Sequence, residues 1–338
     1  MAEGVRLAIV GATGAVGQEM MKILEEREFK VKELICLADP REAGNKVRFR
    51  DEDLKVKAAN AAAFKQADIA LFAVNTDISK ALAPLARENN CLVIDNSYAF
   101  RLEENVPLVV PEVNPEDIAK HQGIIANPNC STTIMVVALN PIHKAARLKR
   151  VLVSTYQAVS GAGKAGIDEL EQHVRAYLAG DDIVPEVFQY PIAFNLIPHI
   201  DDFLSDNYTR EEMKLVWETR KIMHAPDLKI AATAVRVPVF RSHSESITVE
   251  TEIPLKAEEV KTIFSQAPGV VLQDQPEKQL YPMPLYTSNK DEVYVGRIRQ
   301  DLSLDNGILF WVVADQIRKG AATNAIQIAE IVVNDSLY

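Results

Sequence analysis

A cysteine with polar neighbours stands in the segment NPNCSTT at residues 127–133. Pro128 interrupts the preceding structure, and the run from Ser131 to Leu139 predicts a helix, so Cys130 is expected at a helix N-terminus. The positive end of the helix dipole favours the thiolate, which is the nucleophilic form of cysteine. A buried, inert cysteine is the alternative. The other two cysteines lie in or beside apolar runs and fit that alternative better: Cys36 and Cys91.

A nucleophilic thiol needs a partner that carries protons, and imidazole does so near neutral pH. His243 lies in RVPVFRSHSES, residues 236–246, between two β-rich segments, and strand ends are where catalytic groups collect. His199 follows Pro198 in a predicted loop and stays ambiguous. Sequence spacing alone does not bring either histidine to Cys130. The remaining histidines stand in polar or helical contexts typical of solvated surface groups: His121, His143, His173 and His224.

Two loops of small residues follow predicted strands. The first, GATGAVG at residues 11–17, precedes a helix, so its glycines would let the backbone approach a pyrophosphate at the helix N-terminus. Its spacing is GxxGxxG instead of the commoner GxGxxG, and a structural turn is the alternative. The second, YQAVSGAGKAG at residues 156–166, is either a flexible turn or a place of close ligand approach. It is no P-loop, because Ala165 stands where Ser or Thr would hold magnesium. No HExxH, CxxC or Cys/His ligand spacing occurs, so no metal is expected.

The elements that must position these residues fall into two series. Up to about residue 130, strands alternate with helices, which predicts a doubly wound parallel sheet. Beyond it, β-rich segments with partial alternation predict a mostly antiparallel sheet with one covered face. An apolar helix at 319–333 is expected to return to the first domain, and the proline-containing segment 273–289 to form an irregular loop. The predicted domains are 1–129 with 318–338, and 130–317. The predicted strands are 5–10, 34–37, 69–74, 92–94, 151–156, 230–240, 246–253, 293–299 and 308–314, and the predicted helices include 15–26, 79–88, 166–178 and 210–223.

Composition narrows the class of protein. A chain of 338 residues exceeds what one core usually supports, so two domains are expected. Apolar residues at 48% and charged residues at 25% are ordinary for a soluble enzyme. The net charge of −10 argues against nucleic acid or an anionic membrane as partner. The start shows no signal-peptide pattern, no apolar run is long enough to span a membrane, and the few cysteines suit a reducing compartment, so a cytoplasmic location is expected.

Motifs spread along nearly the whole chain, and in the same order, resemble the aspartate-semialdehyde dehydrogenase family. They are GATGAVGQEM (11–20), DNSYAFR (95–101), NPNCSTT (127–133), QAVSGAGKAG (157–166), WETRK (217–221), VRVPVFRSHSESITVE (235–250) and RKGAATNAIQIAE (318–330). The resemblance implies an α/β, Rossmann-type dinucleotide-binding domain joined to an α+β catalytic and dimerisation domain, as in glyceraldehyde-3-phosphate-dehydrogenase-like folds. It also implies a homodimer.

The resemblance assigns roles residue by residue. Cys130 would be the nucleophile, His243 the acid/base group, and Gln157 would orient the substrate. Arg236 would hold the substrate carboxylate and Glu218 its ammonium group, which is chemically sound because guanidinium matches a carboxylate with two hydrogen bonds. The implied phosphate-binding residues are Arg101, Asn129 and Lys221. The implied cofactor-binding residues are Gly11, Thr13, Gly14, Ala15, Val16, Gly17, Arg41, Glu42, Ser160, Gly161 and Gln316.

The reaction that the resemblance implies is the reversible, NADPH-dependent reduction of L-aspartyl 4-phosphate to L-aspartate 4-semialdehyde, with inorganic phosphate released and a thioester formed on Cys130. It would serve the biosynthesis of lysine through diaminopimelate, and of methionine, threonine and isoleucine. Reductases of N-acetylglutamyl phosphate or malonyl-CoA are one alternative, although an amino-acid substrate needs both charges that Glu218 and Arg236 provide. A non-catalytic paralogue is the other, although it should have lost Cys130 or His243.

The segment after the second predicted strand departs from the family pattern. NADP-dependent relatives carry small residues and an arginine there, resembling SARSAG, whereas this chain has DPREAG at residues 39–44. Arg41 would grip the 2′-phosphate of NADP. Asp39, about 20 residues after Gly17, stands where an acid binds the free 2′-hydroxyl of NAD, and its charge would repel a phosphate. NADP is therefore expected, with NAD as a weaker cofactor. The alternative is that both carboxylates point into solvent and Glu42 pairs with Arg41.

Overall fold

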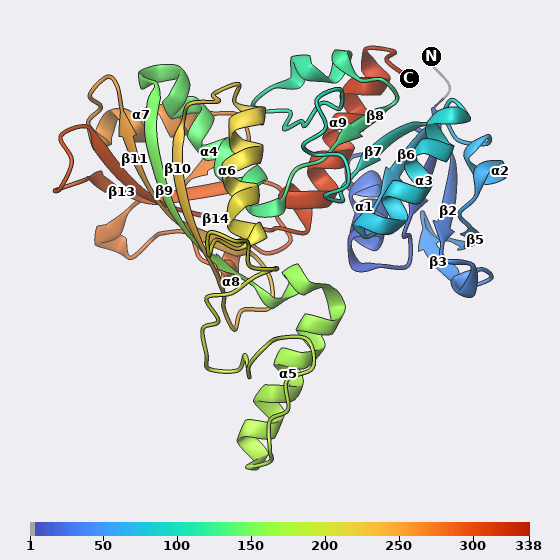
Figure 1. The fold of residues 1–338 in the computed structure, drawn as a ribbon, viewed down its shortest axis with the longest axis horizontal. Coiled ribbons are helices and arrows are strands. Elements are labelled where there is room, and N and C mark those ends of the chain that lie inside the picture. The colour runs from blue at the N-terminus through green and yellow to red at the C-terminus, as the bar shows by residue number, and fades with distance from the viewer. Residues whose placement is uncertain (1–3) are drawn as a thin grey trace. The chain divides into compact units, whose positions relative to one another are not determined.

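The structure of this chain is a computed structural model that describes residues 4–338, coloured along the chain in Figure 1. These residues form two compact units. Unit 1 contains the described residues up to Asn129 together with Ala321–Tyr338, and unit 2 contains Cys130–Gly320. The last helix therefore packs in unit 1, although it follows unit 2 in the sequence.

Unit 1 is built on a parallel sheet with the strand order β5-β2-β1-β6-β7-β8. From β1 the chain runs first towards β2 and β5, and later on the other side towards β6, β7 and β8. This reversal places the C-terminal end of β1 at a topological switch point, where open α/β sheets bind their ligands. The strands of unit 1 are β1 (Val5–Val10), β2 (Val31–Ala38), β5 (Lys57–Ala58), β6 (Ile69–Phe72), β7 (Leu92–Asp95) and β8 (Ile124–Ala126), with a separate hairpin of β3 (Lys46–Phe49) and β4 (Glu52–Lys55).

Both faces of this sheet are covered, which explains why its strands are continuous apolar runs. Leu7 and Ile9 of β1 enter one hydrophobic cluster with residues of α1 and α9, whereas Ala8 and Val10 enter another with residues of α2 and α3. The predicted doubly wound architecture is confirmed. The helices of unit 1 are α1 (Ala15–Glu26), α2 (Ala61–Phe64), α3 (Thr76–Glu88, which continues through Pro84) and α9 (Thr323–Asn334).

Unit 2 contains a mixed sheet with the order β10-β9-β11-β14-β13-β12. Its three central pairs are antiparallel, whereas the outer pairs β10–β9 and β12–β13 are parallel. Long connections precede β10 and β13, and a parallel pair requires such a crossover. The strands are β9 (Leu148–Gln157), β10 (Lys229–Arg236), β11 (His243–Thr251), β12 (Val270–Leu272), β13 (Val293–Gln300) and β14 (Gly307–Ala314).

Helices α4, α6 and α7 pack on one face of this sheet. Along β9 the side chains alternate accordingly: Thr155 and Gln157 are buried, whereas Tyr156 is half-buried on the other face, where its ring lies 5.4 Å from that of Trp311. One covered face was predicted from the sequence. The helices of unit 2 are α4 (Cys130–Ala146), α5 (Gly163–Ala179), α6 (Arg210–Ile222), α7 (Ala257–Gln266) and α8 (Pro284–Thr287).

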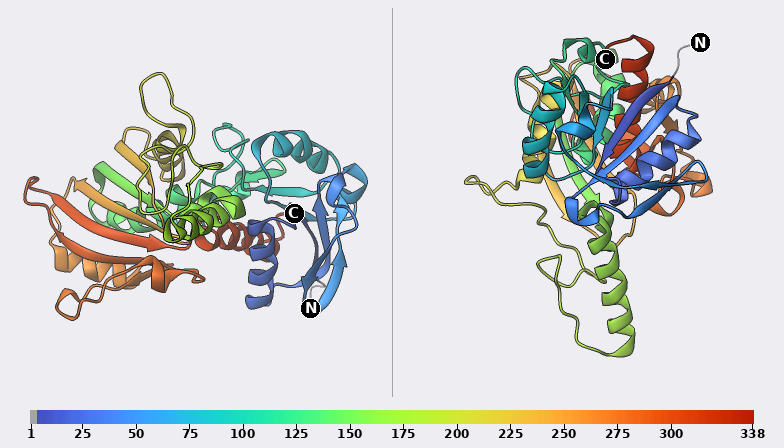
Figure 2. Two further views of the ribbon diagram at one scale, coloured as in Figure 1. Left: turned by 90° about the horizontal axis from the view of Figure 1, so that it is seen from below. Right: turned by 90° about the vertical axis from the view of Figure 1, so that its right-hand side faces the viewer.

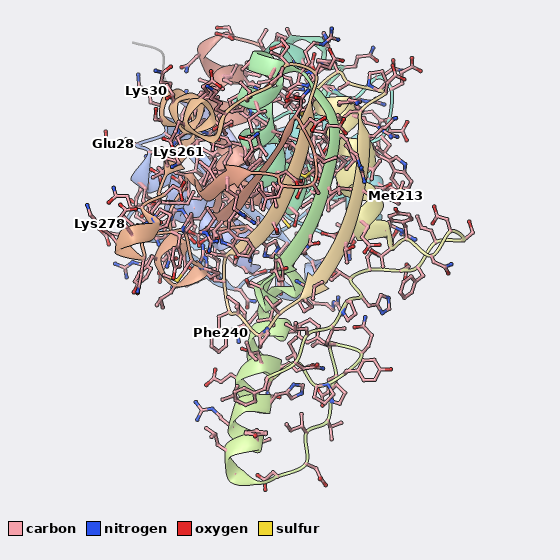
Figure 3. All side chains as sticks on the ribbon, turned by 90° about the vertical axis from the view of Figure 1, so that its left-hand side faces the viewer. Glu28, Lys30, Met213, Phe240, Lys261 and Lys278 are labelled. Carbon is pink, nitrogen blue, oxygen red and sulfur yellow. The ribbon has the colours of Figure 1, made fainter. Side chains whose placement is uncertain are left out.

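An arm projects from the sheet of unit 2, formed by α5 and the returning segment 180–208 (Figures 1 and 2). Figure 3 shows its side chains, many of them aromatic or aliphatic, with Phe240 labelled where the arm meets the sheet. The returning segment is fastened to α5 by the carboxylate of Glu169, which accepts hydrogen bonds from three successive backbone N–H groups, those of Glu186, Val187 and Phe188.

His173, one turn after Glu169, is also enclosed by this segment. Its Nε2 lies 3.2 Å from the carbonyl oxygen of Val184, and its Nδ1 accepts from the N–H of Ile192 at 3.3 Å. The expectation of a solvated surface histidine is wrong for His173, which is 3% exposed. Sequence context missed this because the covering residues come from the loop that folds back over α5.

Other differences from the sequence prediction are local. The strand predicted at 230–240 ends at Arg236, just before the Val237-Pro238 pair, and the segment 273–289 contains helix α8 and a 3-10 turn at Pro276–Lys278, each beginning with proline. The hairpin β3–β4, helix α7 and strand β12 were not predicted: the three strands have at most four residues each, whereas α7 does bury Val260 and Phe264 on one face. Within residues 4–338, no helix combines the length and apolarity needed to cross a bilayer.

Candidate active site

In unit 1, the loop Gly11–Gly17 joins the C-terminal end of β1 to α1. Gly11 has a φ of 88°, and a β-carbon there would lie 2.4 Å from the carbonyl oxygen of Ala73. A β-carbon on Gly17 would lie 2.2 Å from the carbonyl oxygen of Gly11. Glycine is therefore required at both positions. The N-cap residue of α1 is Gly14, which has no side chain to occupy the first N–H groups of the helix, so the loop fits a pyrophosphate.

A hollow of about 360 Å³ adjoins this loop, with Gly11 in its wall. Its lining is mostly apolar and comes from strand ends and from α3, including Val10, Ala38, Val74 and Leu82. Asp39 and Glu42 also line it. A largely apolar hollow beside a pyrophosphate loop, with polar groups at its rim, suits the adenosine part of a dinucleotide.

Arg41 and Glu42, which lie near this hollow, each form a hydrogen bond with a partner that the sequence did not indicate. Arg41 donates from Nε (2.8 Å) and Nη2 (3.1 Å) to the carboxylate of Asp39. These hydrogen bonds lower the pKa of Asp39 from 3.8 to about 2. The carboxylate of Glu42 instead accepts from Oγ1 of Thr13 at 2.7 Å. The alternative, in which Glu42 pairs with Arg41, is therefore wrong, because Asp39 caps the 3-10 turn Pro40–Glu42 and also accepts from the backbone N–H of Arg41.

Arg101 and Asn129, two predicted phosphate ligands, also belong to unit 1. Arg101 is 7% exposed and donates from Nε to the carbonyl oxygen of Asn127 (3.0 Å) and from Nη2 to that of Asn96 (2.7 Å). The side chain of Asn127 donates to Asn96 Oδ1 (2.9 Å) and accepts from Asn324 of α9 (2.6 Å). The segments that carry Arg101 and Asn129 are thus locked together beyond the ends of β7 and β8.

In unit 2, candidate residues gather at one edge of the sheet. Gln157 ends β9 and is paired with Arg236, which ends β10. His243 begins β11 and is paired with Ala314, which ends β14. Helix α4, which packs on β9, β11 and β14, begins at Cys130 as predicted. Strand register therefore brings together residues that are far apart in the sequence.

Arg236 and His243 both lie against Gly161. A β-carbon at Gly161 would lie 2.6 Å from Arg236 Nη1 and 3.4 Å from His243 Nε2. Arg236 is 6% exposed and donates from Nη1 to the carbonyl oxygen of Ala158 at 2.7 Å. Burial lowers the pKa of Arg236, while the charges of Glu211 and then Cys130 oppose that shift. A thiolate at Cys130 is thus within electrostatic reach of this guanidinium.

His243 is held as a neutral imidazole. Its Nδ1 accepts the N–H of Ala158 at 3.1 Å, so its proton is on Nε2. Complete burial, followed by the positive charge of Arg236, lowers the pKa of His243 from 6.5 to about 3, against the charge of Glu211. No described residue makes a hydrogen bond to Nε2. The side chain can therefore donate from Nε2 to an oxygen of a bound molecule.

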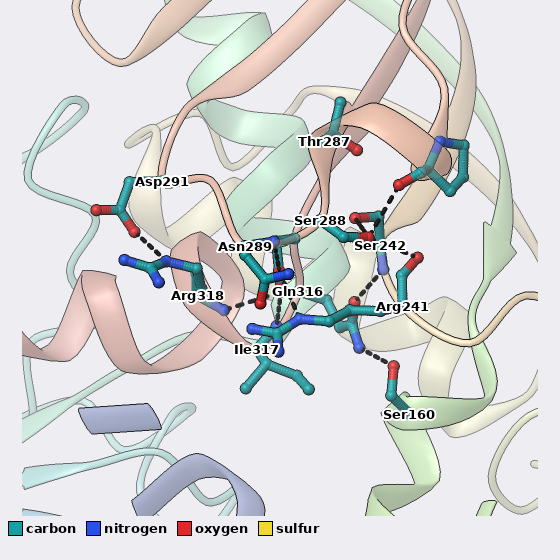
Figure 4. Close-up of polar contacts among 12 residues, drawn as sticks. Ser160, Arg241, Ser242, Thr287, Ser288, Asn289, Asp291, Gln316, Ile317 and Arg318 are labelled. Carbon is teal, nitrogen blue, oxygen red and sulfur yellow. Dashed lines mark hydrogen bonds and ion pairs between the residues drawn. The ribbon is translucent and has the colours of Figure 1, made fainter. Parts of the chain in front are cut away.

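Ser160 and Gln316, predicted cofactor ligands, are joined directly (Figure 4). Gln316 donates from Nε2 to Ser160 Oγ at 2.5 Å, and its Oε1 accepts the N–H of Ser242 at 2.9 Å. Because Ser160 precedes Gly161 and Ser242 precedes His243, this amide links the loop after β9 to the start of β11. Sequence order gave no indication of this link.

On α6, Glu218 is fully buried and Lys221, one turn later, is half-buried. Residues three apart share a helix face, and α6 packs against α4 and β10. Beside Cys130, a β-carbon on Gly320 would lie 2.7 Å from the cysteine Cβ. The segment after β14 thus passes close to the candidate nucleophile.

Two buried acids at this edge were missed in the sequence. Glu211 accepts from Gln157 Nε2 (3.3 Å) and from Lys214 Nζ (3.0 Å). It stands in the first turn of α6, where acids are common, and the neighbouring Glu212 does form a capping box with Thr209, so the sequence signal indicated only a helix start.

The second is Asp315, which directly follows β14. It accepts from Arg241 Nε at 2.5 Å and from three backbone N–H groups, those of Asn289 (2.7 Å), Ile317 (2.9 Å) and Arg318 (3.2 Å). Asp315 therefore fixes the segment that carries Gln316. A single acid after a strand offers no sequence signal for this role.

Known proteins resemble this chain over nearly its full length. Residues 6–121 match the family model for the NAD binding domain of semialdehyde dehydrogenase, and residues 139–319 match that for its dimerisation domain. The chain is similar to aspartate-semialdehyde dehydrogenase of Aquifex aeolicus, with 52% identity over 99% of each chain. It is also similar to the crystal structure of aspartate semialdehyde dehydrogenase II of Vibrio cholerae complexed with ASA, with 47% identity, 99% of each chain covered and a TM-score of 0.96. The corresponding Candida albicans structure with NADP has 25% identity, covers 99% of this chain and 100% of its own, and has a TM-score of 0.78.

Two family models in tandem thus cover most of the chain, the first of them for a nicotinamide-dinucleotide-binding domain and the second for a dimerisation domain. Relatives with about half of their residues identical match over nearly the full length. This chain therefore belongs to the aspartate-semialdehyde dehydrogenase family of oxidoreductases.

Proposed function

We propose that this protein catalyses the reversible, NADPH-dependent reduction of L-aspartyl 4-phosphate to L-aspartate 4-semialdehyde, in the biosynthesis of lysine through diaminopimelate and of methionine, threonine and isoleucine. The names of its relatives support this reaction. The observation that carries the proposal is the buried, neutral His243, whose Nε2 lies beside Arg236 within electrostatic reach of Cys130.

The first step is nucleophilic attack by the Cys130 thiolate on the acyl carbon of aspartyl phosphate. Phosphate leaves with the electrons of the acyl C–O bond, and a thioester forms on Cys130. The N-terminal end of α4 and the charge of Arg236 both favour the thiolate. The leaving phosphate is bound by Arg101, Asn129 and Lys221, which supply the donors that this acidic protein needs for an anion.

The glycine loop at the start of α1 and the apolar hollow beside it have the steric room and the free helix N–H groups that NADPH needs. The loop Gly11–Gly17, with Thr13, Ala15 and Val16, would hold the pyrophosphate, and the adjoining hollow would take the adenosine. Arg41 and Glu42 would contact the 2′-phosphate end of the cofactor, and Ser160, Gly161 and Gln316 would contact its nicotinamide end. When bound, the nicotinamide supplies or accepts a hydride.

His243 acts on the acyl oxygen of the intermediate carried by Cys130. In the tetrahedral hemithioacetal this oxygen carries negative charge, and the Nε2–H of His243 donates to it, which stabilises the oxyanion in a site from which water is excluded. Breaking the C–S bond then releases the aldehyde and restores the thiolate. A neutral histidine with its proton on Nε2 is the state required in the reductive direction.

The substrate is oriented by charges matched to an amino acid. Arg236 binds its carboxylate and Glu218 its ammonium group, while Gln157 orients the reacting group. The hydrogen bond from Gln157 to Glu211 fixes the amide in one orientation. N-Acetylglutamyl phosphate lacks the free ammonium group and malonyl-CoA lacks the amino group altogether, so neither matches Glu218.

The test is NADPH oxidation with aspartyl phosphate, with N-acetylglutamyl phosphate and malonyl-CoA as competing substrates. Wild type should turn over only aspartyl phosphate at an appreciable rate. Cys130→Ala should abolish turnover, whereas Cys36→Ala and Cys91→Ala, at buried thiols, should retain it. A thioester trapped by mass spectrometry should map to the peptide that contains Cys130. Ordinary turnover by Cys130→Ala would show that the thioester mechanism is wrong.

We also propose that the protein is a cytoplasmic homodimer that associates through unit 2. The match to a dimerisation domain and the half-buried Tyr156 and Trp311 on the sheet face opposite α4 support this. Light scattering should give twice the monomer mass, and Trp311→Glu should shift the protein towards monomer.

A further inference from the structure

The arm of unit 2 brings an aromatic ring to the edge of the sheet where the candidate residues lie. The guanidinium carbon of Arg236 is 5.7 Å from the centroid of the Phe188 ring, which is within the range of a cation–π contact. Phe188 packs against the cluster of Val159, Leu170 and Ile197 and is half-buried. Phe188 thus contacts the guanidinium of Arg236, while Ile197 of the same arm segment exchanges backbone hydrogen bonds with Arg236 (2.8 and 3.0 Å).

The ring and the guanidinium are each restrained by backbone. A β-carbon on Gly166 of α5 would lie 3.1 Å from Phe188 Cζ. Arg236 Nη1 is fixed by the carbonyl oxygen of Ala158 at 2.7 Å and lies against Gly161. Because Arg236 is almost fully buried, water does not screen its attraction to the ring, and such contacts are strongest when desolvated.

Glu169 fixes the backbone that carries this ring. Its carboxylate, 5% exposed, accepts the N–H groups of the three residues ending at Phe188, with that of Phe188 at 3.2 Å. A buried carboxylate needs such donors, so the arm segment and the carboxylate stabilise each other. Two aromatic residues that follow in this segment are instead exposed: Tyr190 is 65% exposed and Phe194 67%.

We propose that Phe188 is a positioning residue for substrate binding: it orients the guanidinium of Arg236 towards the carboxylate of the amino-acid substrate, and Glu169 sets the position of Phe188. The proposal rests on the proposed function, in which Arg236 binds that carboxylate. Removing the ring leaves the hydrogen bond from Nη1 to Ala158 but takes away the cation–π contact on the guanidinium. Through Phe188, the arm thus contributes to recognition of the carboxylate of an α-amino acid.

The test is steady-state kinetics in the oxidative direction with aspartate semialdehyde, phosphate and NADP. Phe188→Leu should raise the KM for the semialdehyde about tenfold, with kcat and the KM values for phosphate and NADP unchanged. Phe188→Tyr should restore the wild-type value, because it keeps the ring. Phe194→Leu makes the same substitution at an exposed arm residue and should change none of these constants.

Glu169→Gln should show the same isolated rise in semialdehyde KM, and the double variant Phe188→Leu/Glu169→Gln should be no worse than Phe188→Leu, because both act through one contact. Unchanged semialdehyde KM in Phe188→Leu would overturn the proposal. So would an equal effect on all three KM values, or additivity of the two substitutions, since either indicates a general structural role. If Phe188→Leu does not fold, Glu169→Gln decides: an isolated rise in the semialdehyde KM supports the proposal, and an unchanged semialdehyde KM overturns it. Failure of wild type to oxidise the semialdehyde would instead refute the proposed function.

Discussion

Both units present a loop of small residues directly after a buried strand, but the two loops are surrounded by different kinds of group. The loop Gly11–Gly17 is shaped by main-chain atoms, and the charges beside it are exposed: the side chain of Arg41 is 89% accessible and that of Asp39 37%. The loop at Ala158–Gly161 lies among buried polar side chains, with His243 fully buried and Arg236 nearly so.

The difference shows two ways of building a site. A site made of backbone needs glycines at fixed places within one short segment, and charges near it remain screened by water. A site made of side chains collects residues from several strands and helices, and burial then changes their protonation states. Binding at the backbone-built site depends on steric room, and chemistry at the side-chain-built site depends on which groups carry protons.

The largest effect should come from the buried proton carrier. His243→Asn should lower kcat by about 10²–10³-fold while leaving the substrate KM nearly unchanged, because asparagine keeps polarity but does not place a donor where the Nε2–H group of His243 meets the oxyanion. His199→Asn is the matched control: His199 is half-buried in the same unit, and its ring stacks on that of Phe203 at 4.4 Å. Equal losses in both variants would mean that His243 has no special role.

Breaking the backbone-built site should cost less and act on the cofactor alone. Gly17→Ala places a methyl group 2.2 Å from the carbonyl oxygen of Gly11, so the loop must shift. Overpacking of about 1–3 kcal/mol corresponds to a cofactor Kd raised about tenfold to hundredfold. The rate of Cys130 alkylation in unit 2 should not change. Gly14→Ala, whose β-carbon would be 3.5 Å from the same oxygen, should have a smaller effect. The ranking is measured by cofactor titration, and a reversed order would exclude the steric explanation.

The same difference determines how much the sequence could predict. The Gly11–Gly17 loop and helix α1 follow from neighbouring residues, so their positions were predictable from glycine spacing and apolar pattern. Cys130 at the start of α4 was also predictable, since Pro128 and the following apolar run are local. The approach of Arg236 to His243 depends on strand register, and Glu211 and Asp315 act across the fold. Local patterns do not encode these contacts, and the resemblance to a family supplied roles for the first pair but not for the two acids.

Another buried acid of unit 2, Glu245, should affect the pH dependence of the free energy of unfolding. Glu245 lies two residues after His243 on β11, is fully buried, and has no hydrogen bond from any described residue to either carboxylate oxygen. Burial raises its pKa well above 4.5. Above pH 4.5 the unfolded chain therefore loses this proton while the folded protein keeps it, so the contribution of Glu245 to stability falls as pH rises, by about 1.4 kcal/mol for each pH unit until the folded group ionises.

Glu245→Gln removes this titration while keeping the side-chain shape. Urea unfolding should give nearly equal free energies of unfolding for variant and wild type at pH 4.5. As the pH is raised, the variant should become progressively more stable than wild type. The measurement at pH 4.5 is the internal control for any effect of the amide itself. A difference that does not change with pH would indicate that Glu245 ionises normally in the folded state.

The smallest effect concerns the exposed charges beside the cofactor hollow, and it tests whether they choose between NADP and NAD. Arg41 donates twice to Asp39, so the 2′-phosphate of NADP must compete with that carboxylate for the same guanidinium. Asp39→Ser should therefore raise the ratio of kcat/KM for NADP over NAD, and Arg41→Ala should lower it. Exposed ion pairs are weak, so changes of about threefold to fivefold in this ratio are expected.

Asp53→Ser is the control, because Asp53 also pairs with an exposed cation, Lys46 at 3.3 Å, but does not line the hollow. If Asp39→Ser and Asp53→Ser give the same NADP-over-NAD ratio, the carboxylate of Asp39 plays no part in cofactor choice. Steric fit in the loop Gly11–Gly17 would then decide it.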